Sequence, residues 1–171
     1  ENDIAIIFCD KKHSPLTQLI SSYGMTHRLQ RIQSQFQLSG RTRDRIWKKI
    51  VVNKIINQSK CLENNLHNEN VKLLVNLAKD VSYGDKSNKE AQAARIYFKD
   101  LYGKQFKRGR YNDIINSGLN YGYSILRSFI KKELALHGFE MSLGIKHRSK
   151  ENPFNLADDI IEVFRPFVDN I

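Results

Sequence analysis

Two carboxylates near the C-terminal end of the sequence have the spacing of a cation site. Asp159 and Glu162 lie within residues 155–167, whose apolar side chains recur at helical spacing. At about 100° per residue the two acids lie about 60° apart, at one edge of the apolar stripe. Like charges so close weaken a helix unless a cation lies between them. A hard divalent cation would relieve this strain, because it prefers carboxylate oxygens and accepts a histidine nitrogen.

A histidine precedes this helical segment, in a basic loop. His147 has Lys146, Arg148 and Lys150 as neighbours and the acidic segment downstream. The other four histidines lie in polar contexts typical of a protein surface. A lone histidine in a loop is more often structural than a ligand, so both roles stay open. Lys146 and Arg148 are expected to contact phosphate if the loop binds nucleic acid.

A third acid, Glu90, lies at the start of another helical segment. Ser87 stands three residues before it, which is the spacing of a capping box. Glu90 also shares the apolar side of the segment with Ala94, Tyr97 and Leu101. A carboxylate drawn out of water needs a partner, because an uncompensated buried charge is costly. Spacing alone therefore supports a helix cap and a functional acid equally.

Cations and carboxylates are segregated along the chain. Residues 104–150 contain ten Lys or Arg and three acids, whereas residues 151–171 contain one Arg and five acids. Residues 11–62 contain eleven Lys or Arg and one acid, and the formal net charge is +10. This imbalance predicts a nucleic acid or another polyanion as the partner, although any single cation could be a solvated surface residue. The cations of this region expected to contact phosphate are Arg41, Arg43, Arg45, Lys48, Lys49 and Lys54.

The composition is that of one globular domain. The 171 residues with 40% apolar content can bury one core of ordinary size. Cys9 and Cys61 have neither metal-site spacing nor the density of a disulfide scaffold, which favours a reducing compartment. The sequence shows neither an apolar run of transmembrane length nor the order of a signal peptide. We therefore expect a soluble, intracellular protein with no membrane partner.

The elements that must position these side chains are mainly helical. Residues 3–9 predict a strand covered on both faces, and residues 16–20 a weak second strand. Because isolated strands are unstable in water, residues 1–22 are expected to be the remnant of an N-terminal β-domain. Residues 23–171 are expected to form an α-helical domain. Its helices are predicted at 26–39, 42–61, 68–81, 87–103, 112–137 and 155–167.

Two of these helices carry further predictions. Asn155 is the predicted N-cap of the last helix, with Asp158 reaching back as in a capping box. The helix at 112–137 is apolar around most of its circumference, which is typical of the central helix of a bundle. The basic loop before it, residues 103–110, is either a flexible connector or a phosphate contact.

Five ordered motifs resemble one family. They are IWKKIVVNKIINQ, NKEAQAARIYFKDLYG, GLNYGYSILRSFI, LGIKH and NLADDIIEVFRPFVD. Together they are similar to the helical domain of the CRISPR-associated spacer-acquisition integrase, also described as a metal-dependent DNA endonuclease, and the likeness covers nearly the whole chain. The resemblance implies a helical-bundle catalytic domain after an N-terminal β-domain, in a cytoplasmic prokaryotic protein. Relative to that pattern, we expect the first strands of the β-domain and the segment after FRPFVD to be missing from this sequence.

The resemblance also implies a site, a reaction and partners. The positions that match the family's metal site are Glu90, His147 and Glu162, with Asp159 as the alternative or supporting acid. The implied cofactor is Mg²⁺ or Mn²⁺. The implied reaction is attack by the 3′-hydroxyl of a captured DNA fragment on a phosphodiester, and water as the nucleophile would instead give a nuclease. The implied partners are double-stranded DNA, a second copy in a homodimer, and a small CRISPR-associated protein that bridges two dimers.

A competing hypothesis belongs to a different class of protein. It is a non-catalytic nucleic-acid-binding scaffold, or an inactive paralogue, whose acids cap helices and pair with Arg or Lys. RNA also stays open as a substrate, because backbone contacts alone do not distinguish the two sugars.

Overall fold

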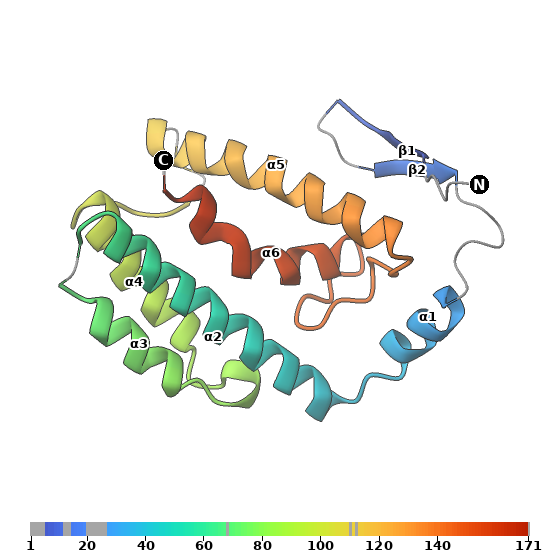
Figure 1. The fold of residues 1–171 in the computed structure, drawn as a ribbon, viewed down its shortest axis with the longest axis horizontal. Coiled ribbons are helices and arrows are strands. Elements are labelled where there is room, and N and C mark those ends of the chain that lie inside the picture. The colour runs from blue at the N-terminus through green and yellow to red at the C-terminus, as the bar shows by residue number, and fades with distance from the viewer. Residues whose placement is uncertain are drawn as a thin grey trace. The chain divides into compact units, whose positions relative to one another are not determined.

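The described part of the chain is mainly α-helical, as predicted (Figure 1). The structure, a computed structural model, describes residues 6–11, 15–19, 27–67, 69–109, 111 and 113–170. Two short strands and a 3-10 turn accompany the helices. In chain order the elements are β1 (Ile6–Cys9), β2 (Pro15–Leu19), α1 (Arg28–Phe36), α2 (Gly40–Asn64), α3 (Val71–Lys79), η1 (Tyr83–Asp85), α4 (Lys89–Tyr102), α5 (Ile114–Leu136) and α6 (Asn155–Val168).

The two strands form an antiparallel pair. Ile6 lies opposite Leu19 and Phe8 opposite Thr17, with an irregularity in register after Phe8. Both predicted strands are therefore present, although residues 3–5 and 20 lie outside the described residues. The predicted cover on both faces is wrong, because the side chains of Ile6 and Phe8 are exposed. The predicted boundary between residues 22 and 23 also lies outside the described residues.

Each predicted helix is found, with ends shifted by a few residues. α2 extends beyond the predicted range of 42–61 at both ends, and α5 is slightly shorter than predicted. α5 is not the buried central helix that its composition predicts. Leu119 and Tyr123 are buried, whereas Tyr121 and Ile125 on the other side are 70% and 50% exposed. Apolar residues around a helix do not show which of its faces has a neighbour.

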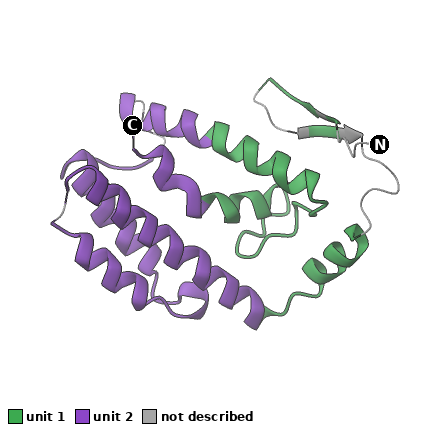
Figure 2. Ribbon diagram, viewed as in Figure 1, with its two compact units in different colours: residues 1–40, 124–161 green, residues 41–123, 162–171 purple. Residues whose placement is uncertain are grey.

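The chain divides into two compact units (Figure 2). The first unit contains residues 1–40 and 124–161, and the second contains residues 41–123 and 162–171. The division falls within α5 and within α6, so each of these helices contributes one part to each unit.

The first unit is built around the C-terminal part of α5 and the N-terminal part of α6. Ile130, Ala157 and Ile161 form its buried apolar cluster. An ion pair between Arg127 of α5 and Asp158 of α6 joins the same two helices. This pair corrects the prediction that Asp158 serves as a capping-box acid.

The second unit is built from α2, α3 and α4 with the ends of α5 and α6. α3 packs against α4, and the core includes Val51, Ile55 and Leu62 of α2. Leu74 of α3 and Tyr97 of α4 are wholly buried. Burial of large aliphatic and aromatic side chains is the main favourable term that holds these helices together.

Candidate metal and nucleic-acid site

Two of the predicted site acids meet at one ammonium group within the second unit. Lys54 Nζ of α2 lies 2.6 Å from Glu90 Oε1 of α4 and 2.5 Å from Glu162 Oε2 of α6. Arg165, three residues after Glu162, donates from Nε to Glu162 Oε1 at 2.8 Å. Side chains that are 36 and 108 residues from Lys54 in the sequence therefore form one charge cluster.

The cluster is held by opposite charges in a place largely withdrawn from water. Burial alone would raise the pKa of the Glu162 carboxyl, but the charges of Lys54 and Arg165 more than offset this and hold it below its usual value. Burial alone would lower the pKa of the Lys54 ammonium. The charges of Glu162 and Glu90 more than offset this effect, so the pKa is raised above its usual value. Both shifts favour the ionised forms of Lys54 and Glu162.

Lys54 lies on the buried side of α2 rather than among the surface cations. Trp47, Val51, Gln58 and Cys61 are seven, three, four and seven residues away from it, and all are buried. The sequence predicts a phosphate contact for Lys54, whereas the structure directs its ammonium to two carboxylates. The helical spacing of Lys54 from the apolar residues Trp47, Val51 and Cys61 is the signal that could have shown its burial.

The start of α4 places Glu90 through an unexpected cap. Asp85, in the 3-10 turn before α4, accepts the backbone N–H groups of Lys89 at 2.8 Å and Glu90 at 3.0 Å. The preceding Gly84 has a φ of 71°, and a side chain there would collide with the Asp44 carboxylate. The predicted cap at Ser87 is therefore corrected to Asp85. The Glu90 carboxylate points to Lys54, so it is not a capping-box acid.

Asp159 holds the loop that carries His147, within the first unit. Its wholly buried carboxylate accepts the backbone N–H groups of Ile145, Lys146 and His147 at 2.5, 3.0 and 3.1 Å. His147 Nδ1 lies 2.8 Å from Asp159 Oδ1, while the imidazole is about half exposed. These bonds fix both the loop and the orientation of the imidazole ring.

The same loop is closed by two further residues. Gly144 approaches the His147 carbonyl oxygen and the Asn155 side chain so closely that a Cβ would collide with both. The Asn155 side-chain amide donates to the carbonyl oxygens of Ser142 at 3.1 Å and Ser149 at 2.9 Å. Asn155 thus anchors the loop, and the prediction that it is the N-cap of α6 is wrong. Asn152, whose Oδ1 accepts the Phe154 N–H at 3.1 Å, has the capping role.

The predicted metal set is divided between the two units. Glu90 and Glu162 meet in the second unit, and His147 with Asp159 in the first. α6 carries one acid of each pair, Asp159 and Glu162, which are three residues apart. Within the described ranges, no group of three or more His, Cys, Asp or Glu side chains has the arrangement of a metal site. The joint site of four residues stays a prediction.

A cationic groove with an exposed aromatic ring lies on the second unit. Its volume is about 600 Å³. The Tyr83 side chain is exposed, and Lys48 Nζ and Arg45 Cζ lie 5.3 and 6.0 Å from the centre of its ring. Arg45 belongs to the basic set for which the sequence predicts phosphate contact, whereas Tyr83 was not singled out, because it belongs to no motif. The groove is lined by Thr42, Arg45, Ile46, Lys48, Lys49, Val52, Asn53 and Tyr83.

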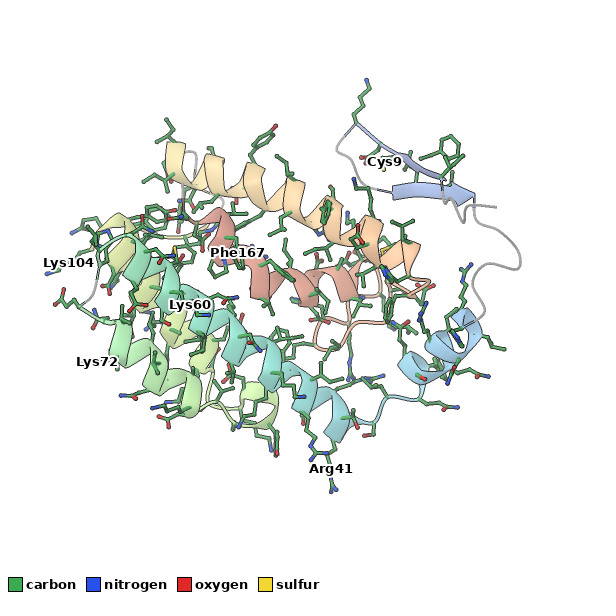
Figure 3. The ribbon with its side chains drawn as sticks, in the orientation of Figure 1. Cys9, Arg41, Lys60, Lys72, Lys104 and Phe167 are labelled. Carbon is green, nitrogen blue, oxygen red and sulfur yellow. The ribbon has the colours of Figure 1, made fainter. Side chains whose placement is uncertain are left out.

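The remaining predicted phosphate contacts lie largely at the surface. Arg41 extends away from the first turn of α2 (Figure 3), and Arg43 is half-buried. Lys146 and Arg148 are exposed on either side of His147. The predicted contacts with phosphate stay predictions.

The end of α6 is tied down by tyrosines. Buried Asp169 accepts hydrogen bonds from the hydroxyls of Tyr97, at 2.9 Å, and Tyr123. The Tyr102 hydroxyl donates to the Asp169 carbonyl oxygen at 2.6 Å. The Arg165 guanidinium lies 4.5 Å from the centre of the Tyr123 ring. This network fixes the helix turn that presents Glu162 and Arg165.

The fold and these side chains define a helical domain that combines a buried carboxylate cluster with a cationic surface groove. The chain belongs to the family described as CRISPR associated protein Cas1, whose family model matches residues 1–171. This membership confirms the family resemblance that the five motifs indicate.

Two curated relatives illustrate the similarity. The chain is 39% identical over 170 residues to the CRISPR-associated endonuclease Cas1 of Neisseria meningitidis serogroup C (strain 8013), covering 99% of this chain and 55% of that protein. It is 28% identical over 185 residues to the CRISPR-associated endonuclease Cas1 1 of Pyrobaculum aerophilum, covering 97% of this chain and 60% of that protein. The chain therefore spans a little over half the length of these relatives.

Solved structures share the fold. A chain in a partial Cas6-RT-Cas1--Cas2 complex matches with a TM-score of 0.81 and 24% identity, over 97% of this chain and 56% of that chain. A casposase bound to an integration product matches with a TM-score of 0.73 and 21% identity, over 98% and 55%. In the part of the chain that the structure describes, no helix has the length and apolar character needed to cross a membrane.

Proposed function

We propose that this chain is the helical catalytic part of a metal-dependent DNA integrase of CRISPR adaptation, which inserts short DNA fragments as new spacers. Family membership supports the proposal, as do the relatives named endonuclease and the structural neighbour bound to an integration product. The observation that carries it is the meeting of Glu90 and Glu162, from α4 and α6, at a single positive charge.

The donor set fits Mg²⁺ or Mn²⁺. Glu90 Oε1 and Glu162 Oε2 both lie within 2.6 Å of Lys54 Nζ, so two carboxylate oxygens already surround one cationic position. Carboxylate oxygens are the ligands that these hard cations prefer. Glu90, Glu162 and His147 would hold the metal. When bound, it supplies Lewis-acid stabilisation of the charge that develops on a phosphodiester.

Asp159 is proposed as the supporting acid that orients His147. Its carboxylate oxygens accept three backbone N–H groups and face the imidazole Nδ1. A histidine that binds a metal through one ring nitrogen commonly donates from the other to a carboxylate. Nε2 is therefore the ring nitrogen we assign to the metal.

DNA would be held by the exposed cations. Lys48 and Lys49 line the groove beside Tyr83, and Arg41 extends from the same helix. Together with Arg43, Lys146 and Arg148 they would contact backbone phosphates without reading sequence. The proposed nucleophile is a DNA 3′-hydroxyl; water in its place gives a nuclease.

The proposed partners are double-stranded DNA, a second copy of the chain and a small CRISPR-associated protein that bridges two dimers. Two of the structural neighbours are named as Cas6-RT-Cas1--Cas2 complexes, which supports an assembly of this kind. Sedimentation of the full-length protein with and without the small protein tests the stoichiometry; a monomer under both conditions would contradict it.

The proposed activity is tested by DNA strand joining with the full-length protein and Mn²⁺. Glu90→Ala and His147→Ala should each abolish joining while leaving DNA binding in place. Lys60→Met, at an exposed position of α2, is the matched control and should join strands normally. Unimpaired joining by either of the first two variants would remove that residue from the site.

One observation favours the competing scaffold hypothesis. Glu162 pairs with both Lys54 and Arg165, as that hypothesis expects of its acids. The two functions separate by their response to metal. DNA binding that is indifferent to Mg²⁺ and Mn²⁺, with no strand transfer, would select the scaffold.

A further inference from the structure

The buried ammonium of Lys54 supports an inference that rests on the proposed metal site and goes beyond it. We propose that Lys54 is an internal counter-ion of Glu90 and Glu162, and that a divalent cation must displace it before binding both carboxylates. Lys54 would then compete with the metal and set the affinity of the site.

The first support is the position of the ammonium. Lys54 is 8% exposed and lies in the buried stripe of α2. Its Nζ lies within 2.6 Å of an oxygen of each glutamate. Charge-assisted hydrogen bonds of this kind are strong, so Lys54 keeps the two carboxylates close when no metal is bound.

The second support is the charge of the cluster. Lys54 and Arg165 carry two positive charges, and Glu90 and Glu162 carry two negative charges. A divalent cation added without any other change would leave two uncompensated positive charges beside a buried carboxylate, which is unfavourable. Mg²⁺ binds carboxylate oxygens at about 2.1 Å, so on the two oxygens that the ammonium already contacts the two cations would lie close together and repel each other.

The third support is an asymmetry between the two cations. The Arg165 guanidinium bonds Glu162 and also lies over the Tyr123 ring, so a second contact holds it in place. Among the described residues, the hydrogen-bond partners of the Lys54 ammonium are the two glutamates themselves. Lysine is a point charge on a flexible stem, whereas arginine is a planar group that stacks on rings. Lys54 is therefore the cation that leaves.

Titration calorimetry with Mn²⁺ and the full-length protein tests this competition. Lys54→Met removes the charge and keeps an apolar side chain in the stripe, so Mn²⁺ should bind at least about tenfold more tightly. The melting temperature without metal should fall, because the two glutamates lose their counter-ion. Lys60→Met makes the same change at an exposed position of the same helix and should alter neither quantity. Glu162→Gln should weaken Mn²⁺ binding.

The outcomes separate this inference from the proposed function. Equal or weaker Mn²⁺ binding by Lys54→Met, with weaker binding by Glu162→Gln, would overturn the role of Lys54 and leave the metal site standing. Mn²⁺ binding that is unchanged in both Glu90→Gln and Glu162→Gln would overturn the metal site and this inference with it.

A second measurement needs no variant, in case Lys54→Met does not fold. Acylation of lysines by an N-hydroxysuccinimide ester, read by mass spectrometry, reports how accessible each ammonium is. Saturating Mn²⁺ should increase the labelling of Lys54 and leave that of Lys60 unchanged. Unchanged labelling of Lys54 at saturating Mn²⁺ would overturn its displacement.

Discussion

At the scale of single residues, Asp159 shows how a fully buried carboxyl group is supplied with hydrogen-bond partners. Three backbone N–H groups and the His147 ring surround its two oxygens. These bonds replace the water that burial removes, which is the condition for burying a charge without a large penalty. Glu162 is buried to a similar degree but is compensated by cations instead. Two acids three residues apart therefore have different roles.

Replacing Asp159 by Asn should destabilise the chain by about 3 kcal/mol, because an amide NH₂ would face backbone donors that need an acceptor. Urea denaturation measures the loss. Hydrogen exchange at the Ile145 and Lys146 amides should also accelerate. Glu151→Gln, an exposed acid of the same region, is the control. Hydrogen-exchange rates that are unchanged at both amides would contradict the anchoring role of Asp159.

Replacement of Tyr83 should separate the contribution of ring stacking to DNA binding from the contribution of charge. Because an aromatic ring stacks on bases whatever their sequence, Tyr83→Ala should weaken binding of DNA with an unpaired strand by about fivefold or more. Tyr83→Phe should retain binding, because it keeps the ring. Tyr111→Ala removes a tyrosine of the same 55% exposure and is the matched control. Fluorescence anisotropy measures the affinities; equal loss in both alanine variants would argue against stacking at Tyr83.

At the scale of elements, the last turn of α6 depends on a buried acid. Burial raises the pKa of Asp169 to about 6, although the hydroxyls of Tyr123 and Tyr97 and the charges of Arg165 and Arg108 lower it. The folded chain therefore binds this proton more tightly than the unfolded chain does. Protonation of Asp169 adds stability as the pH falls through about 6, which is opposite in sign to Glu162 with its lowered pKa.

The stability of wild type relative to Asp169→Asn should rise by about 1 kcal/mol between pH 7 and pH 5. The Asn variant carries no titrating group at this position, so the difference isolates the buried carboxyl. Urea denaturation at several pH values measures it, with Asp80→Asn at an exposed position as the reference. A difference that stays flat, or falls as the pH is lowered, would contradict the raised pKa.

At the scale of the whole molecule, the charge of +10 sets how the chain should respond to salt. Each phosphate contact releases counter-ions from DNA, so affinity falls as salt rises. Lys48→Met and Lys49→Met should each reduce the slope of log affinity against log salt by roughly 1. Lys54→Met should leave the slope unchanged, because its ammonium is buried between glutamates. Binding titrations at three or more salt concentrations give the slopes, and a lower slope for Lys54→Met would contradict its placement.

Periodicity predicts the helices well because their core faces are regular. Ile50, Val51 and Ile55 recur at helical spacing on α2, and burial of all three confirms that face. Contacts between residues on different helices are not predicted in this way. No local rule shows that Lys54 meets Glu90 and Glu162, because that contact depends on how three helices pack. For the same reason the sequence left the role of Glu90 open.

Caps and exposed faces were harder to predict than helices. The caps fell to Asp85 and Asn152 rather than to Ser87 and Asn155, because several polar residues near each helix start satisfy the same local rule. The apolar outer side of α5 reads like a core face in sequence, since composition cannot distinguish a covered surface from an open one. Tyr83 belongs to no periodic pattern, so its place in the groove emerged only from the fold.

The spacing of two acids along α6 is set by the helix itself. It carries the acid that holds the histidine loop and, three residues later, the acid that meets the lysine of α2. Because each residue advances an α-helix by about 100°, one residue inserted between them would swing the glutamate away while the aspartate stayed on its loop. A substitution elsewhere in this helix leaves the angle between the two acids unchanged, whereas an insertion or deletion between them would not.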